Sequence, residues 1–188
     1  NDVFYYKFVN INIMINTIFL VGYMGAGKSV IGKSLSKSLG CKFFDLDSYI
    51  EFKEGKKISK IFEEKNEVFF RKLENKYLKE LILIKDKKII STGGGTPCFE
   101  NNFNIIQSCS NSVSIYLKAS VETILNRLKG SVDKRPIISH FQNKDSMKEF
   151  IKKHLFERSF YYEKSKIKIS TDNIEIRDIV HLIKEVLT

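Results

Sequence analysis

The sequence has few of the residues that characterise linker-rich, disulfide-bonded or zinc-binding proteins. Only two prolines, Pro97 and Pro136, occur in 188 residues, so no proline-rich linker divides the chain and a single domain over residues 1–188 is expected. The three cysteines, Cys41, Cys98 and Cys109, form neither a C-x-x-C motif nor metal-ligand spacing with histidine. This cysteine pattern is typical of a reduced, cytoplasmic setting.

Long apolar runs are also missing. The only candidate, near the N-terminus, is interrupted by Asn10, Asn12 and Asn16, so neither a membrane span nor a secretory signal is expected. Residues 1–13 show no clear periodicity, and Met14 lies just before the first predicted strand. We therefore interpret residues 1–13 as an N-terminal extension and residues 14–188 as the main domain.

Arginine is scarce although the chain is basic. The net charge is +10, from 32 Lys and Arg against 22 Asp and Glu, and the lysines are scattered mostly opposite apolar stripes, as on solvated surfaces. A nucleic-acid-binding protein remains an alternative that rests on this charge alone, since no RNA-binding signature occurs. Arginine in a lysine-rich chain points to sites that need a planar, bidentate donor. The five arginines are Arg71, Arg127, Arg135, Arg158 and Arg177.

The segment at residues 22–29, GYMGAGKS, matches the phosphate-binding loop G-x-x-x-x-G-K-[ST]. In such a loop backbone N–H groups surround a phosphate, the lysine (Lys28) reaches its oxygens, and the hydroxyl (Ser29) ligates Mg²⁺. The loop follows an apolar segment and precedes a helical pattern that stops near Gly40, an order that places phosphates at a helix N-terminus. The expected ligand is a nucleoside triphosphate.

Short apolar segments alternate with helical patterns along the rest of the chain, which predicts an α/β domain with a mostly parallel sheet. Ligands are then expected above the carboxyl ends of the strands. Strands are predicted at residues 17–21, 42–47, 88–92, 113–117 and 167–170, and helices, besides the one that follows the loop, at 48–53, 58–64, 66–84, 99–108, 121–128, 144–162 and 174–187.

Three polar features lie near the predicted strands and the long helix. Asp45 and Asp47 could both face the phosphate loop, although acids are also favoured at the start of the following helix. Arg71 lies beside the buried stripe of the long helix with Glu74 one turn later, either as a functional pair or as a surface ion pair of little weight. The triple glycine at residues 93–95 either approaches a ligand closely or forms a flexible turn.

The stretch at about residues 130–139 is polar and lacks periodicity. It contains Arg135, and we interpret it as a mobile lid that brings this arginine to the phosphates and excludes water. An ordinary solvent-exposed loop is the alternative. The histidines His140, His154 and His181 share no metal-ligand spacing and are expected to be structural.

These motifs together resemble the shikimate kinase family from about Asn16 onward. The features in the family's order are GYMGAGKS at 22–29, Asp45-Leu-Asp47, Phe70-Arg71-Lys-Leu-Glu74, the triple glycine at 93–95, Lys134-Arg135-Pro136, and Glu157-Arg158 followed by Tyr161 and Tyr162. The resemblance implies a P-loop kinase fold, similar to nucleoside monophosphate kinases, with a central parallel sheet flanked by helices and a mobile lid. It also implies transfer of the ATP γ-phosphoryl group to the 3-hydroxyl of shikimate, a step towards chorismate and the aromatic amino acids.

The resemblance further implies a role for individual residues. Residues that would hold the ATP phosphates are Gly25, Ala26, Gly27, Lys28, Ser29 and Val30, with Arg127 and Arg135 on the nucleotide side. Mg²⁺ would bind Ser29 directly and Asp45 through water. Asp47 would bind the shikimate hydroxyls and orient or deprotonate the attacking one, with Lys28 and Arg135 as the other catalytic groups. Arg71, Arg158 and the backbone of Gly94 would bind the shikimate carboxylate.

Two other kinases, for gluconate or for a nucleoside monophosphate, would share the loop and the lid. Neither would explain the paired aspartates together with two carboxylate-binding arginines. We expect a monomer whose partners are the small molecules shikimate and ATP, with no nucleic acid and no membrane.

Overall fold

The computed structural model describes residues 15–129 and 143–187. The predicted N-terminal extension and the predicted lid at 130–139, with Arg135, lie outside this described part of the chain. Within it, the strands are β1 (Thr17–Val21), β2 (Lys42–Asp45), β3 (Lys88–Ser91), β4 (Ser112–Lys118) and β5 (Ile167–Ser170). They form one sheet in the order β2-β3-β1-β4-β5, and every neighbouring pair is parallel.

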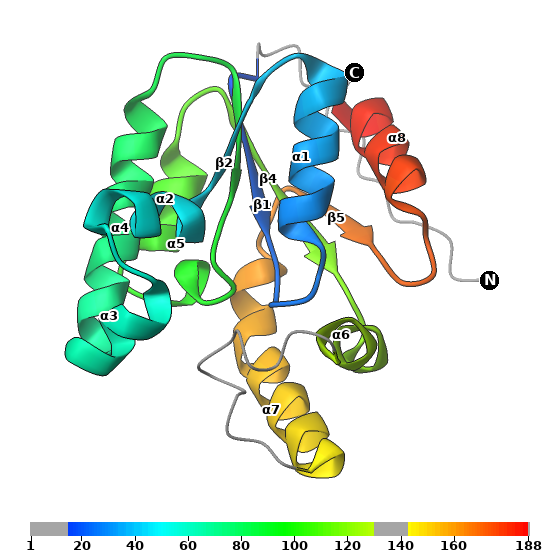
Figure 1. Ribbon diagram of the computed structural model, residues 1–188. Helices are drawn as coiled ribbons and strands as arrows, with labels where there is room; N and C mark the ends of the chain where they lie inside the picture. The colour runs from blue at the N-terminus through cyan, green and yellow to red at the C-terminus, as the bar shows by residue number, and fades with distance from the viewer. Residues whose placement is uncertain (1–14, 130–142, 188) are drawn as a thin grey trace.

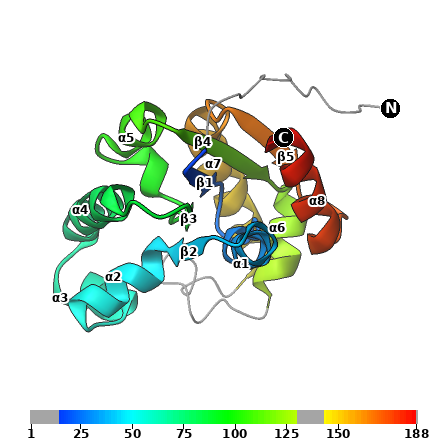
Figure 2. The same ribbon diagram turned by 90° about the horizontal axis from the view of Figure 1, so that it is seen from above.

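Helices connect these strands and cover both faces of the sheet (Figures 1 and 2). They are α1 (Lys28–Leu39), α2 (Leu46–Glu54), α3 (Ile58–Glu64), α4 (Glu67–Leu83), α5 (Asn102–Ser108), α6 (Val121–Leu128), α7 (Lys144–Tyr162) and α8 (Ile176–Leu187), with a short 3₁₀ turn η1 (Thr96–Cys98). Figure 2 shows α1 and α8 on one face and α4 and α5 on the other. The predicted parallel α/β architecture is confirmed.

The centre of the sheet is built from β1, whose five residues are all buried. A strand covered on both faces reads as a continuous apolar run, which is why Ile18, Phe19 and Leu20 follow one another. Helix α1 packs closely on this sheet at Gly32, where a Cβ would lie 2.4 Å from the Phe43 ring. Only glycine allows this approach, and it sets the helix that follows the phosphate loop firmly against the sheet.

Several predicted boundaries were wrong, and two of these differences have a clear local cause. The strand predicted at 42–47 ends at Asp45, because the Asp45 side chain accepts a hydrogen bond from the Ser48 backbone N–H at 3.2 Å and thereby caps α2. Asp47 therefore lies in the first turn of a helix rather than in a strand. The helix predicted from residue 99 begins only at Asn102, because η1 and Glu100, with a φ of 51°, intervene.

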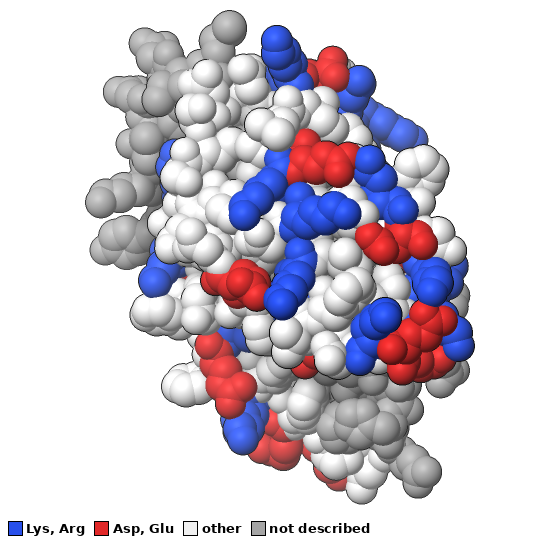
Figure 3. Space-filling model, turned by 90° about the vertical axis from the view of Figure 1, so that its left-hand side faces the viewer, with Lys and Arg blue, Asp and Glu red and all other residues white. Residues whose placement is uncertain are grey.

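Positive and negative charges are mixed on one side of the molecular surface. Figure 3 shows lysines and arginines interspersed with aspartates and glutamates on the side of the molecule where α3 and α4 lie. Ion pairs such as Lys56–Glu64 at 2.6 Å and Lys57–Glu51 at 2.8 Å join the two signs. This agrees with the solvated-surface interpretation of the lysines on this face. No helix of residues 15–129 and 143–187 is long and apolar enough to cross a membrane.

Candidate active site

The loop between β1 and α1 has the backbone of a phosphate cradle. Gly22, Gly25 and Gly27 adopt φ angles of 140°, 79° and 97°, in the region that favours glycine. A Cβ on Gly22 would also lie 2.6 Å from the Leu117 carbonyl oxygen. Lys28 Nζ donates hydrogen bonds to the carbonyls of Gly22 and Tyr23, at 2.7 and 2.9 Å, so the ammonium group lies across the loop.

This loop borders a cavity of about 500 Å³ at the carboxyl ends of the strands. Predicted site residues that line it are Gly25, Gly27, Lys28, Ser29, Val30, Asp45, Asp47, Gly94 and Arg127. An apolar wall that the sequence did not indicate comes from Ile174, Ile176 and Ile179, at and before the start of α8. Such a wall suits the flat face of a nucleotide base.

Ser29 and Asp45 bring two oxygen ligands together. Ser29 Oγ donates to Asp45 Oδ2 at 2.5 Å, and both residues line the cavity. The described residues contain no cluster of three or more His, Cys, Asp or Glu side chains that could hold a metal ion. A hydroxyl and a carboxylate nevertheless fit Mg²⁺, which keeps several waters and completes its shell with substrate phosphates rather than with a protein cage.

Asp47 projects from the first turn of α2 towards the same cavity. Burial, together with the nearby carboxylates of Glu74 and Asp45, raises the pKa of its carboxyl to about 7, against smaller opposing effects of Lys28 and Arg71. Asp47 Oδ1 is buried and has no hydrogen-bond partner among the described residues. A buried carboxylate oxygen of this kind, at the edge of a cavity, is suited to pair with a ligand hydroxyl.

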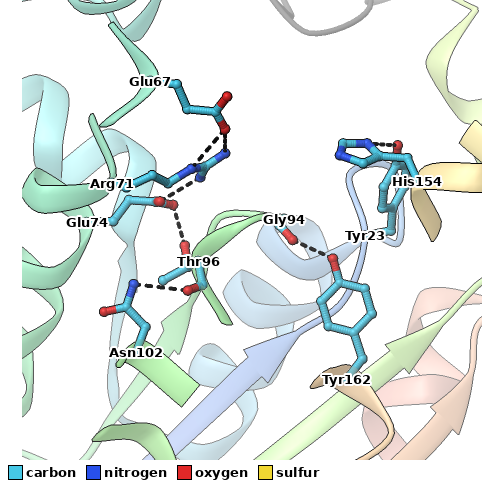
Figure 4. A network of polar contacts seen from close by, with 9 residues as sticks. All are labelled: Tyr23, Glu67, Arg71, Glu74, Gly94, Thr96, Asn102, His154 and Tyr162. Atoms are coloured by element: carbon cyan, nitrogen blue, oxygen red, sulfur yellow. Dashed lines mark hydrogen bonds and ion pairs between the residues drawn. The ribbon is translucent and has the colours of Figure 1, made fainter. Parts of the chain in front are cut away.

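Arg71 belongs to an ion-pair network that joins it to the buried Glu74 and to the exposed Glu67 (Figure 4). Its Nη1 donates to Glu74 at 2.6 Å, and its Nε and Nη2 donate to Glu67 at 3.2 and 2.7 Å. Glu74 is fully buried and also accepts from Thr96 Oγ1. Since the Arg71 side chain is only 5% exposed, the alternative of a weak surface pair is wrong.

Arg158 and Arg71 lie near the same aromatic ring. The guanidinium groups of Arg71 and Arg158 lie 4.2 and 5.8 Å from the centre of the Phe99 ring, a residue that the sequence did not mark. Arg158 is buried, and its Nη1 has no hydrogen-bond partner within residues 15–129 and 143–187. A Cβ on Gly95 would lie 2.6 Å from Arg71 Nη1, so the glycine turn makes room for the Arg71 guanidinium. Two buried guanidinium groups near one ring are suited to bind a planar anion.

The other arginines differ in their surroundings. Arg127 Nη1 donates to the Gly25 carbonyl at 3.3 Å, and its Nη2 donates to the Thr171 carbonyl at 2.6 Å, so Arg127 ties the phosphate loop to the segment before α8. Arg177 is exposed and pairs with the neighbouring Asp178 at 3.5 Å. Arg135 lies outside the described residues.

Comparisons of the sequence and of the structure with known proteins agree with one another. The family model for shikimate kinase matches residues 24–188. The shikimate kinases of Flavobacterium johnsoniae and Flavobacterium psychrophilum are 46% and 47% identical over 170 residues, which is 90% of this chain and 98% of each relative. A crystal structure of shikimate kinase from Bacteroides thetaiotaomicron matches with a TM-score of 0.83 and 32% identity, over 91% of this chain and 97% of that one.

A second solved structure is closely similar. Shikimate kinase from Acinetobacter baumannii, in complex with shikimate, matches with a TM-score of 0.82 and 31% identity, over 92% of this chain and 93% of that one. A gluconokinase from Sinorhizobium meliloti matches with a TM-score of 0.58 at 14% identity, which indicates a shared fold alone. From the family model and these relatives we conclude that this chain belongs to the shikimate kinase family.

Proposed function

We propose that this site carries out the family's reaction, the ATP-dependent phosphorylation of shikimate at its 3-hydroxyl. One group of residues binds the nucleotide, and another group binds the substrate. On the nucleotide side, the backbone at residues 25–30 holds the phosphates and Lys28 leaves the loop carbonyls to meet their oxygens. Arg127, which joins the loop to Thr171, contacts the nucleotide from that position. Arg135 is assigned to the transferred phosphoryl group from the family resemblance alone.

On the substrate side, Arg71 and Arg158 bind the shikimate carboxylate. A guanidinium has five N–H donors, and Arg71 uses three of them on Glu67 and Glu74, which leaves two for a ligand. The unpartnered Nη1 of Arg158 supplies a further donor. The Gly94 backbone, which lines the cavity, adds a hydrogen bond to the same carboxylate.

Asp47 prepares the attacking hydroxyl. Its carboxylate accepts a hydrogen bond from the 3-hydroxyl and takes the proton as the new P–O bond forms. A pKa of about 7 suits such a base near neutral pH. Since phosphoryl transfer depends largely on positioning and charge neutralisation, the Asp47 side chain also acts by holding the hydroxyl in line with the γ-phosphorus.

Ser29 and, through water, Asp45 would hold Mg²⁺, which neutralises charge on the ATP phosphates when it is bound. The protein acts as a monomer on small-molecule substrates, in the cytoplasm. Its product leads towards chorismate and the aromatic amino acids.

The observation that carries this proposal is the presence of two buried arginines near Phe99, beside the glycine turn that also contributes Gly94 to the cavity wall. It is tested by coupled measurement of ADP formation from ATP with shikimate, gluconate or AMP as the acceptor. ADP formation that depends on shikimate alone is expected. Turnover with gluconate or AMP, and none with shikimate, would refute the substrate assignment while leaving the nucleotide site intact.

A further inference from the structure

Helix α7 presents three side chains at four-residue spacing, His154, Arg158 and Tyr162. Residues four apart in a helix lie on the same face. Arg158 and Tyr162 are buried and His154 is partly buried, so this face points into the molecule. The family resemblance assigns a role to Arg158 alone.

The two neighbours of Arg158 on this face tie α7 to different loops of the active site (Figure 4). The Tyr162 hydroxyl donates to the carbonyl of Gly94 in the glycine turn. One turn before Arg158, His154 Nδ1 lies 2.9 Å from the hydroxyl of Tyr23 in the phosphate loop. The helix is therefore anchored on both sides of its arginine.

The chemistry of the His154 contact is well defined. Burial, with a smaller effect of Arg158, lowers the pKa of His154 to about 4, so the imidazole is neutral near pH 7 and its Nδ1 can accept a hydrogen bond from the Tyr23 hydroxyl. Tyr23 is only 1% exposed, and a buried hydroxyl needs such a partner. The Phe150 ring, 4.9 Å from the His154 ring between centroids, holds the imidazole from another side.

We propose that the Tyr23–His154 hydrogen bond positions Arg158 relative to the phosphate loop, so that Tyr23 and His154 are positioning residues for binding of the substrate carboxylate. The inference rests on the proposed function, because Arg158 is the group that the contact serves. The carbonyl of Tyr23 accepts from Lys28 at 2.9 Å. Tyr23 thus has two contacts. Its backbone contacts Lys28, which is assigned to ATP, and its side chain contacts α7, which carries the arginine assigned to shikimate.

The test uses the full-length enzyme with Tyr23→Phe, His154→Phe and both changes together. Each single change removes one hydrogen bond and should raise the KM for shikimate about 3- to 10-fold, with kcat and the KM for ATP within about twofold of wild type. The double variant should be no worse than the more affected single variant, because both changes remove the same contact. His154→Gln, whose side-chain oxygen can accept a hydrogen bond from the Tyr23 hydroxyl, should keep a KM for shikimate closer to that of wild type.

The matched control is Tyr161→Phe, which removes a hydroxyl from the same helix without touching the phosphate loop and should leave the KM for shikimate unchanged. An analogue of shikimate that carries a hydroxymethyl group in place of the carboxylate should be insensitive to all these changes. A lower melting temperature with an unchanged KM for shikimate would make the pair a packing contact only and would overturn the inference.

A rise in the KM for ATP alone would also overturn the inference, because the pair would then serve the loop and not Arg158. If wild type forms ADP with shikimate and both single variants match it, only the positioning role fails. If wild type forms no ADP with shikimate, the proposed function itself fails. Should His154→Phe not fold, Tyr23→Phe, which keeps the ring and the backbone of the loop, still decides the question.

Discussion

Replacing Arg158 by lysine should weaken shikimate binding and leave ATP binding unchanged. Arg158 is 5% exposed, its guanidinium lies near the Phe99 ring, and its buried Nη1 has no hydrogen-bond partner in the described part of the chain. Lysine keeps the charge at this position. It loses the planar fork that gives a carboxylate two parallel hydrogen bonds.

The size of the effect follows from the bond that lysine cannot replace. Hydrogen bonds to charged groups contribute about 1.5 to 3 kcal/mol each. Loss of one such bond should therefore raise the KM for shikimate roughly 10- to 150-fold. Arg71→Lys should act in the same direction, with an added loss of stability because Arg71 also pairs with the fully buried Glu74.

Steady-state kinetics with each substrate varied in turn measure this effect. Arg177→Lys makes the same chemical change at an arginine side chain that is 86% exposed, and it should alter neither KM. A shikimate analogue without its carboxylate should bind wild type poorly and be nearly indifferent to Arg158→Lys. If Arg158→Lys raised the KM for ATP and left that for shikimate unchanged, the assignment of the two sides of the cavity would be wrong.

Three further changes test other parts of the site. Lys28→Ala should abolish turnover with an unchanged circular dichroism spectrum, because its ammonium lies on the loop rather than in the core; normal activity would remove Lys28 from the ATP site. Asp47→Asn should lower kcat by ~10²- to 10⁴-fold. In wild type, kcat/KM should fall as pH drops through about 7, because a base must lose its proton to act and the raised pKa of Asp47 places that loss near neutrality; a loss under threefold in the variant, or a flat profile, would leave Asp47 a binding residue. Gly95→Ala should raise the KM for shikimate, since the added Cβ would lie 2.6 Å from Arg71 Nη1; an unchanged KM would place Arg71 outside the substrate site.

The local features of the fold could be predicted from the sequence. The bounds of β1, α3, α6, α7 and β5 agree with prediction, because apolar periodicity and turn residues mark those elements directly. The phosphate loop was identified for the same reason: its glycines and lysine act within eight consecutive residues. Arg158 and Gly94, which lie far apart in the chain, required the family resemblance.

Features that depend on tertiary contacts could not be predicted. The sequence left Asp47 either at the end of a strand or at the start of the next helix, and only the hydrogen bond from the Ser48 backbone to the Asp45 side chain decides for the helix. Phe99 and the apolar wall at Ile174 carry no charge or motif that distinguishes them from core residues. The contact between Tyr23 and His154 joins residues 131 positions apart, and the periodicity of a sequence does not predict contacts between such distant residues.

Analysis of the reaction product tests the proposed function most directly. Wild-type enzyme would be incubated with ATP, Mg²⁺ and shikimate, and the products examined by ³¹P–¹H correlation NMR together with ADP quantification. One phosphate ester, coupled to the proton on the carbon of the 3-hydroxyl and equimolar with ADP, is expected. ADP without a phosphate ester, or an ester on another hydroxyl, would contradict the proposal that Asp47, Arg71 and Arg158 present this hydroxyl to the nucleotide.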